Sequence, residues 1–362
     1  MTNFEAFNIQ GIEIKPNVET KNKRYDYVMW GVDNLYAQYL LELKENSPIH
    51  SVACDSTVTM SFGEGVEIEG LGNVLVSKME TISGLYHKIL YDFYLFGGYA
   101  LEIVWSRDRT SIASIYHIPF QKVRCGHLGM DEKEPDTFFY CDDWSDIRRN
   151  PIITYGDVNP ENKEQRQLFY YKRYVPSEND VYPITPYQSG IPAIVLEGEI
   201  FDWHKKSLEN NLTPNLFISL FGDATESERN RVKQELLDVY SGKDGQKLML
   251  SFAPTPEEAP QITPIQSTVG DGYYVDVLGY ASQSVLTSWQ ISSPLLLGIH
   301  SFSSNPFSQN SDELIVATKH WLNYIIKPKL RGLNESLEIV LSMKYNQPVQ
   351  IVNKFTDFSQ LL

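Results

Sequence analysis

A helix pattern that runs straight into a hairpin pattern constrains the fold of this chain more than any other feature. Apolar residues recur every three or four positions over residues 82–96, which predicts a helix with a wide apolar face. Gly97 and Gly98 end it, because glycine readily adopts the left-handed conformation that closes a helix. Strand-like runs at residues 99–105 and 112–118 flank a charged turn, as in a β-hairpin. This succession predicts an α+β fold.

Two further helices are expected before this unit. Asp33 is placed to cap a helix over residues 35–43, whose apolar residues share one face. Ser47 as the N-cap and Pro48 in the first turn predict a second helix, which ends at a glycine. A short strand is expected after it, over residues 66–68.

The middle of the chain is less regular. Residues 126–179 are rich in Asp, Asn and Pro, and we interpret them as a peripheral insertion with strand candidates at residues 138–140 and 168–175. A proline-spaced passage, residues 182–192, leads into a helix-compatible stretch at residues 194–208. This passage is the best candidate for a domain boundary.

The clearest local unit follows that boundary. A strand at residues 215–221, a helix opened by Thr225 and a strand at residues 247–252 predict a small βαβ module. Glu228 stands three residues after Thr225, which is the spacing of a capping box. The apolar face of the helix comprises Val232, Leu236 and Val239.

Two more helices are expected near the end of the chain. Apolar residues in phase predict one helix over residues 273–289 and another over residues 311–326. Pro328 is expected to break the second helix, because proline lacks the amide hydrogen that continues a helix. A polar loop, residues 300–310, separates the two helices.

The composition is that of a folded protein that needs no disulfides. Of 362 residues, 42% are hydrophobic and 12% aromatic, which excludes disordered, collagen-like and coiled-coil classes. Cys54, Cys125 and Cys141 are an odd set at irregular spacing, so we expect free thiols in a reducing compartment. The N-terminus lacks a signal-peptide pattern, and the longest uncharged apolar run, residues 294–299, is too short to cross a bilayer. No membrane segment is therefore expected.

Negative charge dominates the chain and is unevenly distributed. Forty-six acidic residues against 31 basic residues give a net charge of -15, which disfavours tight, sequence-independent DNA binding by a monomer. Residues 248–318 contain no lysine or arginine, whereas the chain average predicts about six. This cation-free segment is too polar to be all core. Its composition suits a surface that lets a polyanion pass without binding it, because each phosphate contact adds affinity.

The sequence contains no recognisable catalytic, cofactor or metal motif. Cys125, His127 and Cys141 supply three soft ligands, but a structural zinc site takes four at paired spacing. The glycine pairs lack the lysine and hydroxyl of a phosphate-binding loop, and no nucleophile elbow or nucleotide fingerprint occurs. We therefore predict no catalytic residue, no cofactor and no metal.

Two clusters of charge have no assigned role. Asp142, Asp143 and Asp146 fit a solvated loop better than a calcium site, because they miss the spacing of a calcium-binding loop. A basic cluster near the last helix is equally compatible with contacts to the phosphate backbone of a nucleic acid and with contacts to the acidic residues of this chain. It consists of Lys319, His320, Lys327, Lys329 and Arg331.

Several short motifs follow one another in a fixed order along most of the chain. They are residues 30–36 (WGVDNLY), 47–50 (SPIH), 90–103 (LYDFYLFGGYALEI), 116–119 (YHIP), Asp202 to His204 with Asn210, Asn211 and Pro214, 292–298 (SSPLLLG), and Asp312 with Glu313. In this order they resemble the portal proteins of tailed bacteriophages, in the short siphovirus-type form found in phages and prophages of Bacteroidetes.

The resemblance implies a protein without enzymatic activity that forms a ring of twelve copies at one vertex of a capsid. Double-stranded DNA would be packaged and ejected through the ring without sequence specificity. The implied partners are other copies of the chain, the large terminase subunit, head-completion or adaptor proteins, and the major capsid or scaffold protein, with no membrane. The implied locations are the capsid vertex of the virion and, during assembly, the host cytoplasm.

The resemblance also assigns a role to each segment. It implies an α/β wing at residues 1–190, paired stem helices at 191–211 and 266–293, a βαβ clip at 212–265, a tunnel loop and wing helix at 294–335, and a C-terminal segment at 336–362. The C-terminal segment is short and has strand-like runs at 337–341 and 349–352, so a helical crown is expected to be reduced or absent.

Two sets of residues carry the expected functional contacts. Val232, Leu236 and Val239 of the clip are expected to contact other subunits. The cation-free segment is expected to face the channel, because it runs from the last clip strand to the tunnel loop. The expected channel residues are His300, Ser303, Ser304, Asn305, Ser308, Gln309 and Asn310.

Two other classes of protein stay open. A ring-forming head-tail adaptor, or another capsid protein without a DNA channel, would carry the acidic segment as an ordinary exposed face. A nucleotide-processing enzyme built on Cys125, His127 and Cys141 would require bound metal, which elemental analysis of the purified protein detects.

Overall fold

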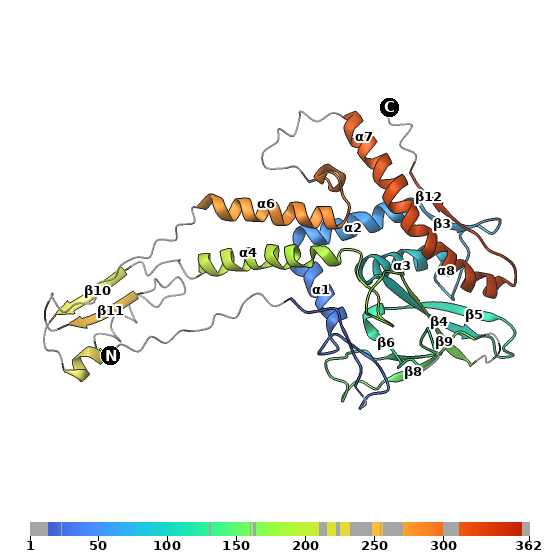
Figure 1. The fold of residues 1–362 in the computed structure, drawn as a ribbon, viewed down its shortest axis with the longest axis horizontal. Coiled ribbons are helices and arrows are strands. Elements are labelled where there is room, and N and C mark those ends of the chain that lie inside the picture. Colours follow the sequence, from blue (N-terminus) through green and yellow to red (C-terminus); the bar gives the residue numbers. More distant parts are fainter. Residues whose placement is uncertain are drawn as a thin grey trace. The chain divides into compact units, whose positions relative to one another are not determined.

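The fold is described from a computed structural model, shown in Figure 1. The structure describes residues 14–209 apart from 23, 130, 131, 160, 162 and 163, and residues 216–221, 225–231, 248–253, 255, 271–299 and 311–356. The chain divides into two compact units. The first consists of Met1–Val195 and Ala281–Leu362, and the second of Leu196–Tyr280.

The first unit begins with two short strands and two helices. These elements are β1 (Glu19–Thr20), β2 (Met29–Trp30), α1 (Tyr36–Asn46) and α2 (Pro48–Phe62). The predicted N-cap of α2 is confirmed, because the Ser47 hydroxyl accepts a hydrogen bond from the His50 amide at 3.1 Å.

The predicted cap of α1 is wrong. Leu35 is the N-cap of this helix and makes no side-chain cap hydrogen bond. Asp33 instead closes the preceding turn: its Oδ1 accepts from the Leu35 amide at 3.0 Å, and its Oδ2 pairs with Lys15 at 2.8 Å. Asn34, which lies between Asp33 and Leu35, has a positive φ of 63°. Because this conformation is not that of a right-handed helix, the helix cannot start at Asp33.

The predicted helix-hairpin unit is confirmed. It comprises α3 (Ile82–Phe96), β4 (Gly98–Trp105) and β5 (Ile112–Ile118), and the two strands pair antiparallel. Gly97 ends α3 at a φ of 90°, and a Cβ on it would lie 2.6 Å from the Ile184 carbonyl oxygen. Conformation and space therefore both require glycine at this position.

Gly97→Ala is expected to lower the free energy of unfolding by about 1–3 kcal/mol, because alanine is strained at positive φ and its Cβ meets a backbone oxygen. Chemical denaturation followed by circular dichroism measures the change. Gly84→Ala in the same helix is the control, with no loss expected, because the Cβ would make only ordinary contacts there. Equal effects of the two substitutions would contradict this explanation.

The interpretation of residues 126–179 as peripheral is wrong for one strand. The main sheet has the order β5-β4-β9-β8-β7-β6, in which β9 (Arg166–Lys172) lies between β4 and β8. Leu168 of β9 is fully buried, because the strand lies inside the sheet and packs against the core. The remaining strands are β6 (Val123–Cys125), β7 (Thr137–Tyr140) and β8 (Ile153–Asp157).

The helix near the C-terminus is longer than predicted, and Pro328 does not break it. α7 (Ser311–His320), a π-helical turn η5 (Trp321–Ile326) and α8 (Lys327–Tyr345) follow without interruption. The Lys327 amide donates to the Leu322 carbonyl, five residues earlier, so this turn is wider than an α-helical one. The wider turn directly precedes Pro328 and accommodates the ring that would clash in a regular helix.

The C-terminal segment combines a wrong and a confirmed prediction. Residues 337–341 lie within α8 and are not a strand, because Leu337, Val340 and Leu341 are buried at helical spacing. The second predicted strand is confirmed as β12 (Ile351–Lys354), shifted by two residues. β12 pairs antiparallel with β3 (Gly65–Ile68), which completes the first unit.

The second unit contains parts of two helices and a strand pair. The helices are α4 (Ile191–Glu209) and α6 (Asp271–Ser288), and the parallel strands are β10 (Leu216–Phe221) and β11 (Leu248–Ala253). Thr225 donates to the Glu228 carboxylate through its amide at 2.9 Å and its hydroxyl at 2.7 Å. Parallel pairing requires a crossover, so the predicted βαβ order is consistent with this arrangement.

Candidate functional site

Most of the residues predicted to act in the channel and the clip lie outside the described residues. This holds for His300, Ser303, Ser304, Asn305, Ser308, Gln309 and Asn310, and for Val232, Leu236 and Val239. Their predicted roles stay predictions. The structure does describe α6 and the turn η4 (Pro294–Leu297) before the predicted loop, and α7 after it.

α6 has a buried face and an exposed face in its described part. Val285 and Leu286 are buried in the core of the first unit. Val275 and Tyr280 are 70% and 76% exposed, and Asp276 is also exposed. The exposed side chains of α6 are therefore neutral or acidic, since the helix has no lysine or arginine. Such a face can meet a polyanion without forming ion pairs with it.

An aromatic cluster fixes the C-terminal end of α6 within the first unit. Trp289, which directly follows the helix, stacks on Tyr187 at a centroid distance of 5.0 Å and an interplanar angle of 17°. Its indole Nε1 donates to His50 Nδ1 at 3.0 Å, and the His50 ring lies 4.4 Å from that of Tyr187. The Tyr187 hydroxyl in turn donates to the Leu95 carbonyl at 2.9 Å.

The same cluster adjoins the start of α4. Tyr187 stands four residues before Ile191, the first residue of α4, and Trp289 follows the last residue of α6. His50 of α2 therefore contacts both chain segments that lead toward the second unit. Burial lowers the pKa of His50 to about 3, so the imidazole is neutral at pH 7 and Nδ1 is free to accept the indole hydrogen.

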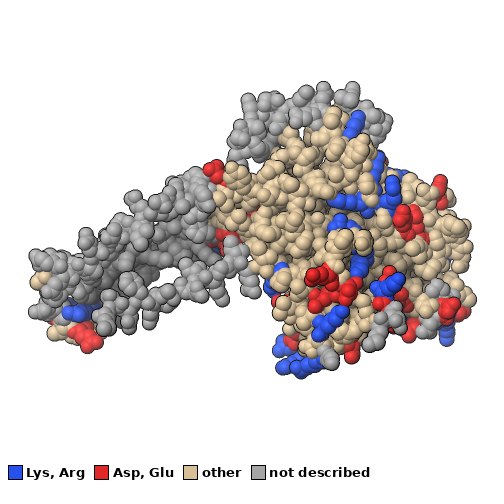
Figure 2. Space-filling view, in the orientation of Figure 1, with Lys and Arg blue, Asp and Glu red and all other residues tan. Residues whose placement is uncertain are grey.

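In the basic cluster near the last helix, His320, Lys327 and Arg331 are exposed, and Lys319 and Lys329 are half-buried. Figure 2 shows Lys and Arg side chains over α7 and α8 on the face turned toward the viewer. Lys327 donates to the Asn323 side chain at 2.8 Å and lies 5.1 Å from the centre of the Phe355 ring. Arg331, one turn further along α8, is exposed.

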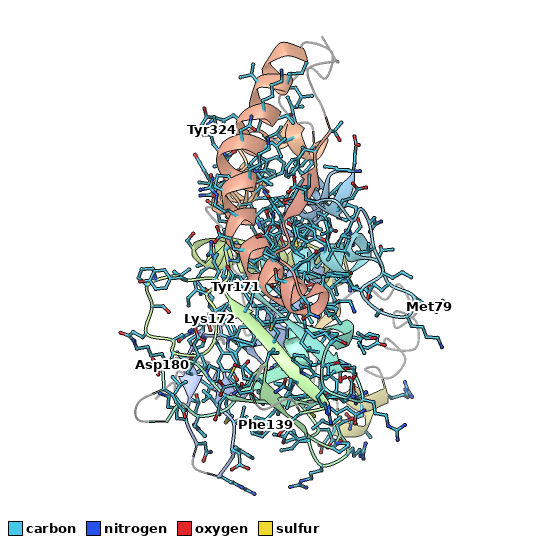
Figure 3. The ribbon with its side chains drawn as sticks, turned by 90° about the vertical axis from the view of Figure 1, so that its right-hand side faces the viewer. Met79, Phe139, Tyr171, Lys172, Asp180 and Tyr324 are labelled. Atoms are coloured by element: carbon cyan, nitrogen blue, oxygen red, sulfur yellow. The ribbon has the colours of Figure 1, made fainter. Side chains whose placement is uncertain are left out.

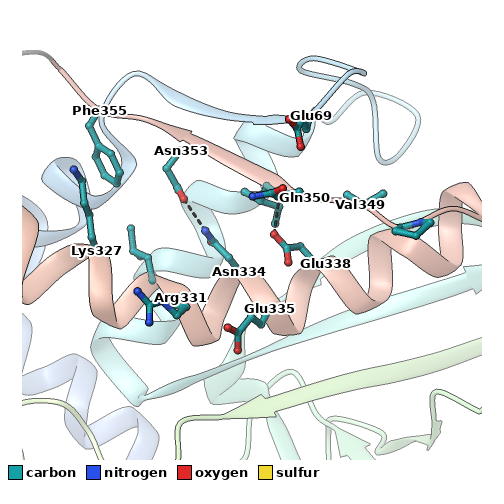
Figure 4. Close-up of a pocket in the computed structure, with 13 residues that line it drawn as sticks. Glu69, Lys327, Arg331, Asn334, Glu335, Glu338, Val349, Gln350, Asn353 and Phe355 are labelled. Atoms are coloured by element: carbon teal, nitrogen blue, oxygen red, sulfur yellow. Dashed lines mark hydrogen bonds between the residues drawn. The ribbon is translucent and has the colours of Figure 1, made fainter.

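A cavity of about 790 Å³ lies between α8 and β12 (Figure 4). Lys327 and Arg331 line it together with Glu335 and Glu338, so it carries both signs of charge. Asn334 donates to the Asn353 side-chain oxygen at 2.6 Å, and Glu338 accepts from the Ile351 amide at 2.8 Å. These bonds join α8 to β12, which accounts for the polar side chains on the cavity wall.

The three candidate zinc ligands have different surroundings. Cys125 is fully buried in β6, His127 Nε2 lies 2.9 Å from the Tyr25 carbonyl oxygen, and the Cys141 thiol donates to the Asp143 carbonyl at 3.2 Å. No group of three or more possible metal ligands occurs among the residues that the structure describes. Burial raises the pKa of Cys125 to about 12, so its thiol is protonated at pH 7.

The acidic cluster does not converge on one point. Asp142 accepts from Lys122 at 2.9 Å, Asp143 accepts from the Ser145 hydroxyl at 2.7 Å, and Asp146 pairs with Arg149 at 3.4 Å. Separate partners of this kind are typical of a solvated loop.

Within the described part of the chain, no helix is long and apolar enough to cross a membrane.

Two buried polar groups could not be found from the sequence. His50 and Trp289 are 239 positions apart, so no local motif joins them. Arg124 is fully buried, although its sequence neighbours gave no sign of that. His50 belongs to the motif at residues 47–50, which contributes to the family resemblance. The motif does not indicate that the imidazole is buried or that it accepts a hydrogen bond.

Comparisons with known proteins identify the fold. No protein-family model and no curated protein matches the sequence. A chain in the virion of a native gene transfer agent particle matches with a TM-score of 0.59 and 14% identity, over 90% of this chain and 85% of that one. A chain in the neck of the native particle, computed with C12 symmetry, matches with a TM-score of 0.56 and 13% identity, over 87% and 83%.

A weaker match is an HK97 family phage portal protein from Corynebacterium diphtheriae, with a TM-score of 0.47 and 9% identity, over 88% of this chain and 95% of that one. The two stronger matches define the class by its fold: this chain has a mixed helix and sheet fold that is similar to those of chains in the virion and neck of the gene transfer agent particle. The predicted resemblance is therefore confirmed at the level of the fold.

Proposed function

We propose that this chain is a portal protein, which forms a ring at one capsid vertex and lets double-stranded DNA enter and leave. The observation that carries the proposal is the match over 90% of the chain to a virion protein. The C12 symmetry of the matching neck structure supports a ring of twelve copies. The neutral to acidic exposed face of α6 supports a channel through which DNA passes with little friction.

The finer assignments belong to the same proposal. Residues 191–211 and 266–293 form the stem, residues 212–265 form the clip that contacts other subunits and the terminase, and residues 300–310 form the tunnel loop. Head-completion proteins and the major capsid or scaffold protein contact the ring from outside the channel. The ring assembles in the host cytoplasm and ends as part of the virion.

Imaging of the purified chain by negative-stain microscopy, with native mass measurement, tests the proposal. Rings with a central hole are expected. A protein that stays monomeric over a wide concentration range, and that forms no ring in capsids, would show the proposal to be wrong. A head-tail adaptor would also form rings, so rings alone do not distinguish the two hypotheses. A portal protein predicts that DNA packaging depends on the channel residues, and an adaptor without a DNA channel predicts that it does not.

Substitution of the tunnel loop provides that distinction. Ser304→Lys with Gln309→Lys adds two cations per protomer, which should tighten DNA association and make it steeper in salt through counterion release. Rings should assemble normally, and packaging should slow or stop short of completion. Ser304→Asn with Gln309→Asn is the uncharged control. Packaging at the parental rate with no added salt-dependent DNA affinity would place the loop away from DNA.

A further inference from the structure

The contacts across the cavity between α8 and β12 fix how its two walls run. Lys327 lies 5.1 Å from the centre of the Phe355 ring, and Glu338 accepts from the Ile351 amide at 2.8 Å. The beginning of α8 is therefore opposite the end of β12, and the two walls run antiparallel. Figure 4 shows Lys327 and Phe355 toward one end of the cavity and Glu338 toward the other.

One end of the cavity is cationic and the other end is acidic. Lys327 and Arg331 line the first end from successive turns of α8. Three carboxylates line the second end, and they belong to Glu69, Glu335 and Glu338. Glu69 lies at this end because its amide donates to the carbonyl of Gln350, the residue before β12, at 2.9 Å. The charges therefore give the cavity a direction.

Contacts within the protein do not use most of these charges. Asn334 and Glu338 make the hydrogen bonds that join α8 to β12. Within the described residues, neither Arg331 nor Glu335 forms an ion pair, although they are four positions apart on one helix, where such pairs are favourable. Both side chains are exposed. They are therefore available to charged groups that enter the cavity.

The cavity has the dimensions of a short extended peptide. Its wall on α8 runs from Lys327 to Glu338, which is about 17 Å at about 1.5 Å per residue. An extended chain covers this length in about five residues, at about 3.3 Å each. Alternate side chains of such a chain point to the same side, so residues four positions apart can reach the two ends from one side. The volume of about 790 Å³ also lies within the range of ligand sites.

The presence of both signs of charge limits the class of the occupant. A nucleic acid would pair its phosphates with Lys327 and Arg331, but the carboxylates in the same cavity would repel the neighbouring phosphates. A free anion or cation is attracted by one end only and fills a small part of the volume. A protein segment can present an acidic side chain to one end and a basic side chain to the other.

An exposed aromatic residue continues the surface beyond the cationic end. Tyr324 lies one turn before Lys327 (Figure 3) and is 70% exposed. The His320 ring lies 5.1 Å from its ring. Tyrosine and arginine are both enriched at protein interfaces, where aromatic rings supply contact area. The surface next to the cavity therefore also favours a protein partner.

We propose that this cavity binds an extended segment of a partner protein that carries an acidic residue and, four positions away, a basic residue. The acidic side chain pairs with Lys327 and Arg331, and a guanidinium can bind a carboxylate through two hydrogen bonds. The basic side chain pairs with the carboxylates at the other end. Complementarity to two ends of opposite charge specifies this occupant. The inference does not depend on ring formation, so it is independent of the proposed function.

Binding of synthetic peptides to the full chain tests the proposal. The probe is GDTVTKG, labelled with fluorescein at its N-terminus and amidated at its C-terminus, in which the acid and the base are four positions apart. GDTVTDG and GKTVTKG are the matched probes with charges of one sign. Fluorescence anisotropy should show that the parent protein binds GDTVTKG at least about tenfold more tightly than it binds either of the others.

Reversal of the cationic end locates the binding. Lys327→Glu with Arg331→Glu leaves only carboxylates as charged groups in the cavity. The affinity for GDTVTKG should fall at least about tenfold, and the affinity for GKTVTKG should rise above that of the parent. Lys133→Glu with Arg148→Glu is the matched control, because it makes the same change in net charge at exposed residues outside the cavity. The control should bind all three peptides as the parent does.

Reversal of the acidic end is a second, separate test. Glu69→Lys with Glu335→Lys changes two exposed residues and keeps Glu338, which bonds to β12. The preference should move from GDTVTKG to GDTVTDG, because cations then predominate in the cavity. Circular dichroism shows whether each variant is folded, and this variant keeps the proposal testable if the first one is not.

Three outcomes would overturn the inference. They are a parent protein that binds none of the peptides, a parent that binds all three equally, and folded variants that keep the parental preference. A short DNA duplex that binds more tightly than GDTVTKG, and that Lys327→Glu with Arg331→Glu releases, would assign the cavity to phosphate and would also refute the inference. Imaging of rings is a separate measurement, so the proposed function and this inference can fail independently.

Discussion

Arg124→Met is expected to lower the free energy of unfolding by about 3–5 kcal/mol. Arg124 is fully buried. Its Nε donates to Asn34 Oδ1 at 2.6 Å, its Nη2 donates to the Asn34 carbonyl at 2.7 Å, and its Nη1 donates to the Val123 carbonyl at 2.8 Å. The substitution removes the guanidinium donor from the Asn34 and Val123 carbonyls, whereas Asn34 Oδ1 still accepts from the Trp30 amide at 3.1 Å. Leaving a buried acceptor without a donor costs more free energy than the lost hydrogen bond itself.

The guanidinium of Arg124 contacts neutral oxygens and an aromatic ring. The guanidinium lies 4.8 Å from the centre of the Trp144 ring, and its partners are carbonyl and amide oxygens. These bonds hold Asn34 at its positive φ and thereby join the start of α1 to β6. Methionine fills the space but cannot satisfy three separate acceptors.

Chemical denaturation followed by circular dichroism measures this change. Arg148→Met is the matched control, because Arg148 is exposed and its loss should change the free energy of unfolding by less than about 0.5 kcal/mol. A loss below about 1 kcal/mol for Arg124→Met would mean that the acceptors find other donors. The explanation by unsatisfied carbonyls would then be wrong.

Trp289→Ala is expected to lower the free energy of unfolding by about 3–5 kcal/mol, because it leaves a cavity between Tyr187 and His50. It also removes the indole donor and leaves His50 Nδ1 buried without a partner. Trp289→Phe keeps one aromatic ring in the stack and loses the donor together with a smaller part of the buried ring volume, so a smaller loss of about 1–3 kcal/mol is expected for it.

Comparing the stability losses of Trp289→Ala and Trp289→Phe tests whether packing of the indole ring stabilises the aromatic cluster. Tyr174→Ala removes an aromatic side chain that is 86% exposed, and it should change stability by less than about 0.5 kcal/mol. Limited proteolysis provides a second measurement, since cleavage within α6 should become faster in Trp289→Ala. If Trp289→Phe and Trp289→Ala lower stability equally, the lost hydrogen bond to His50 would account for the whole effect, and the packing explanation would be wrong.

Local patterns predicted the elements in which one short segment determines its own structure. α3 and the β4-β5 hairpin were predicted closely because helical periodicity, the glycine pair and alternation all lie within residues 82–118. The Ser47 cap of α2 and the extent of α6 were predicted for the same reason. The uneven distribution of charge also belongs to the sequence alone, because it can be counted without any coordinates.

Tertiary structure decided the features that join distant segments. β9 lies inside the main sheet because its backbone pairs with β4, more than 60 positions away, which no local pattern could reveal. Pro328 remains within a helix because the π-helical turn before it makes room for the ring. The contacts of His50 with Trp289 and of Arg124 with Asn34 each join residues from different elements. Periodicity reports which side of an element is apolar, but the partner of a buried polar group is chosen only when the elements pack together.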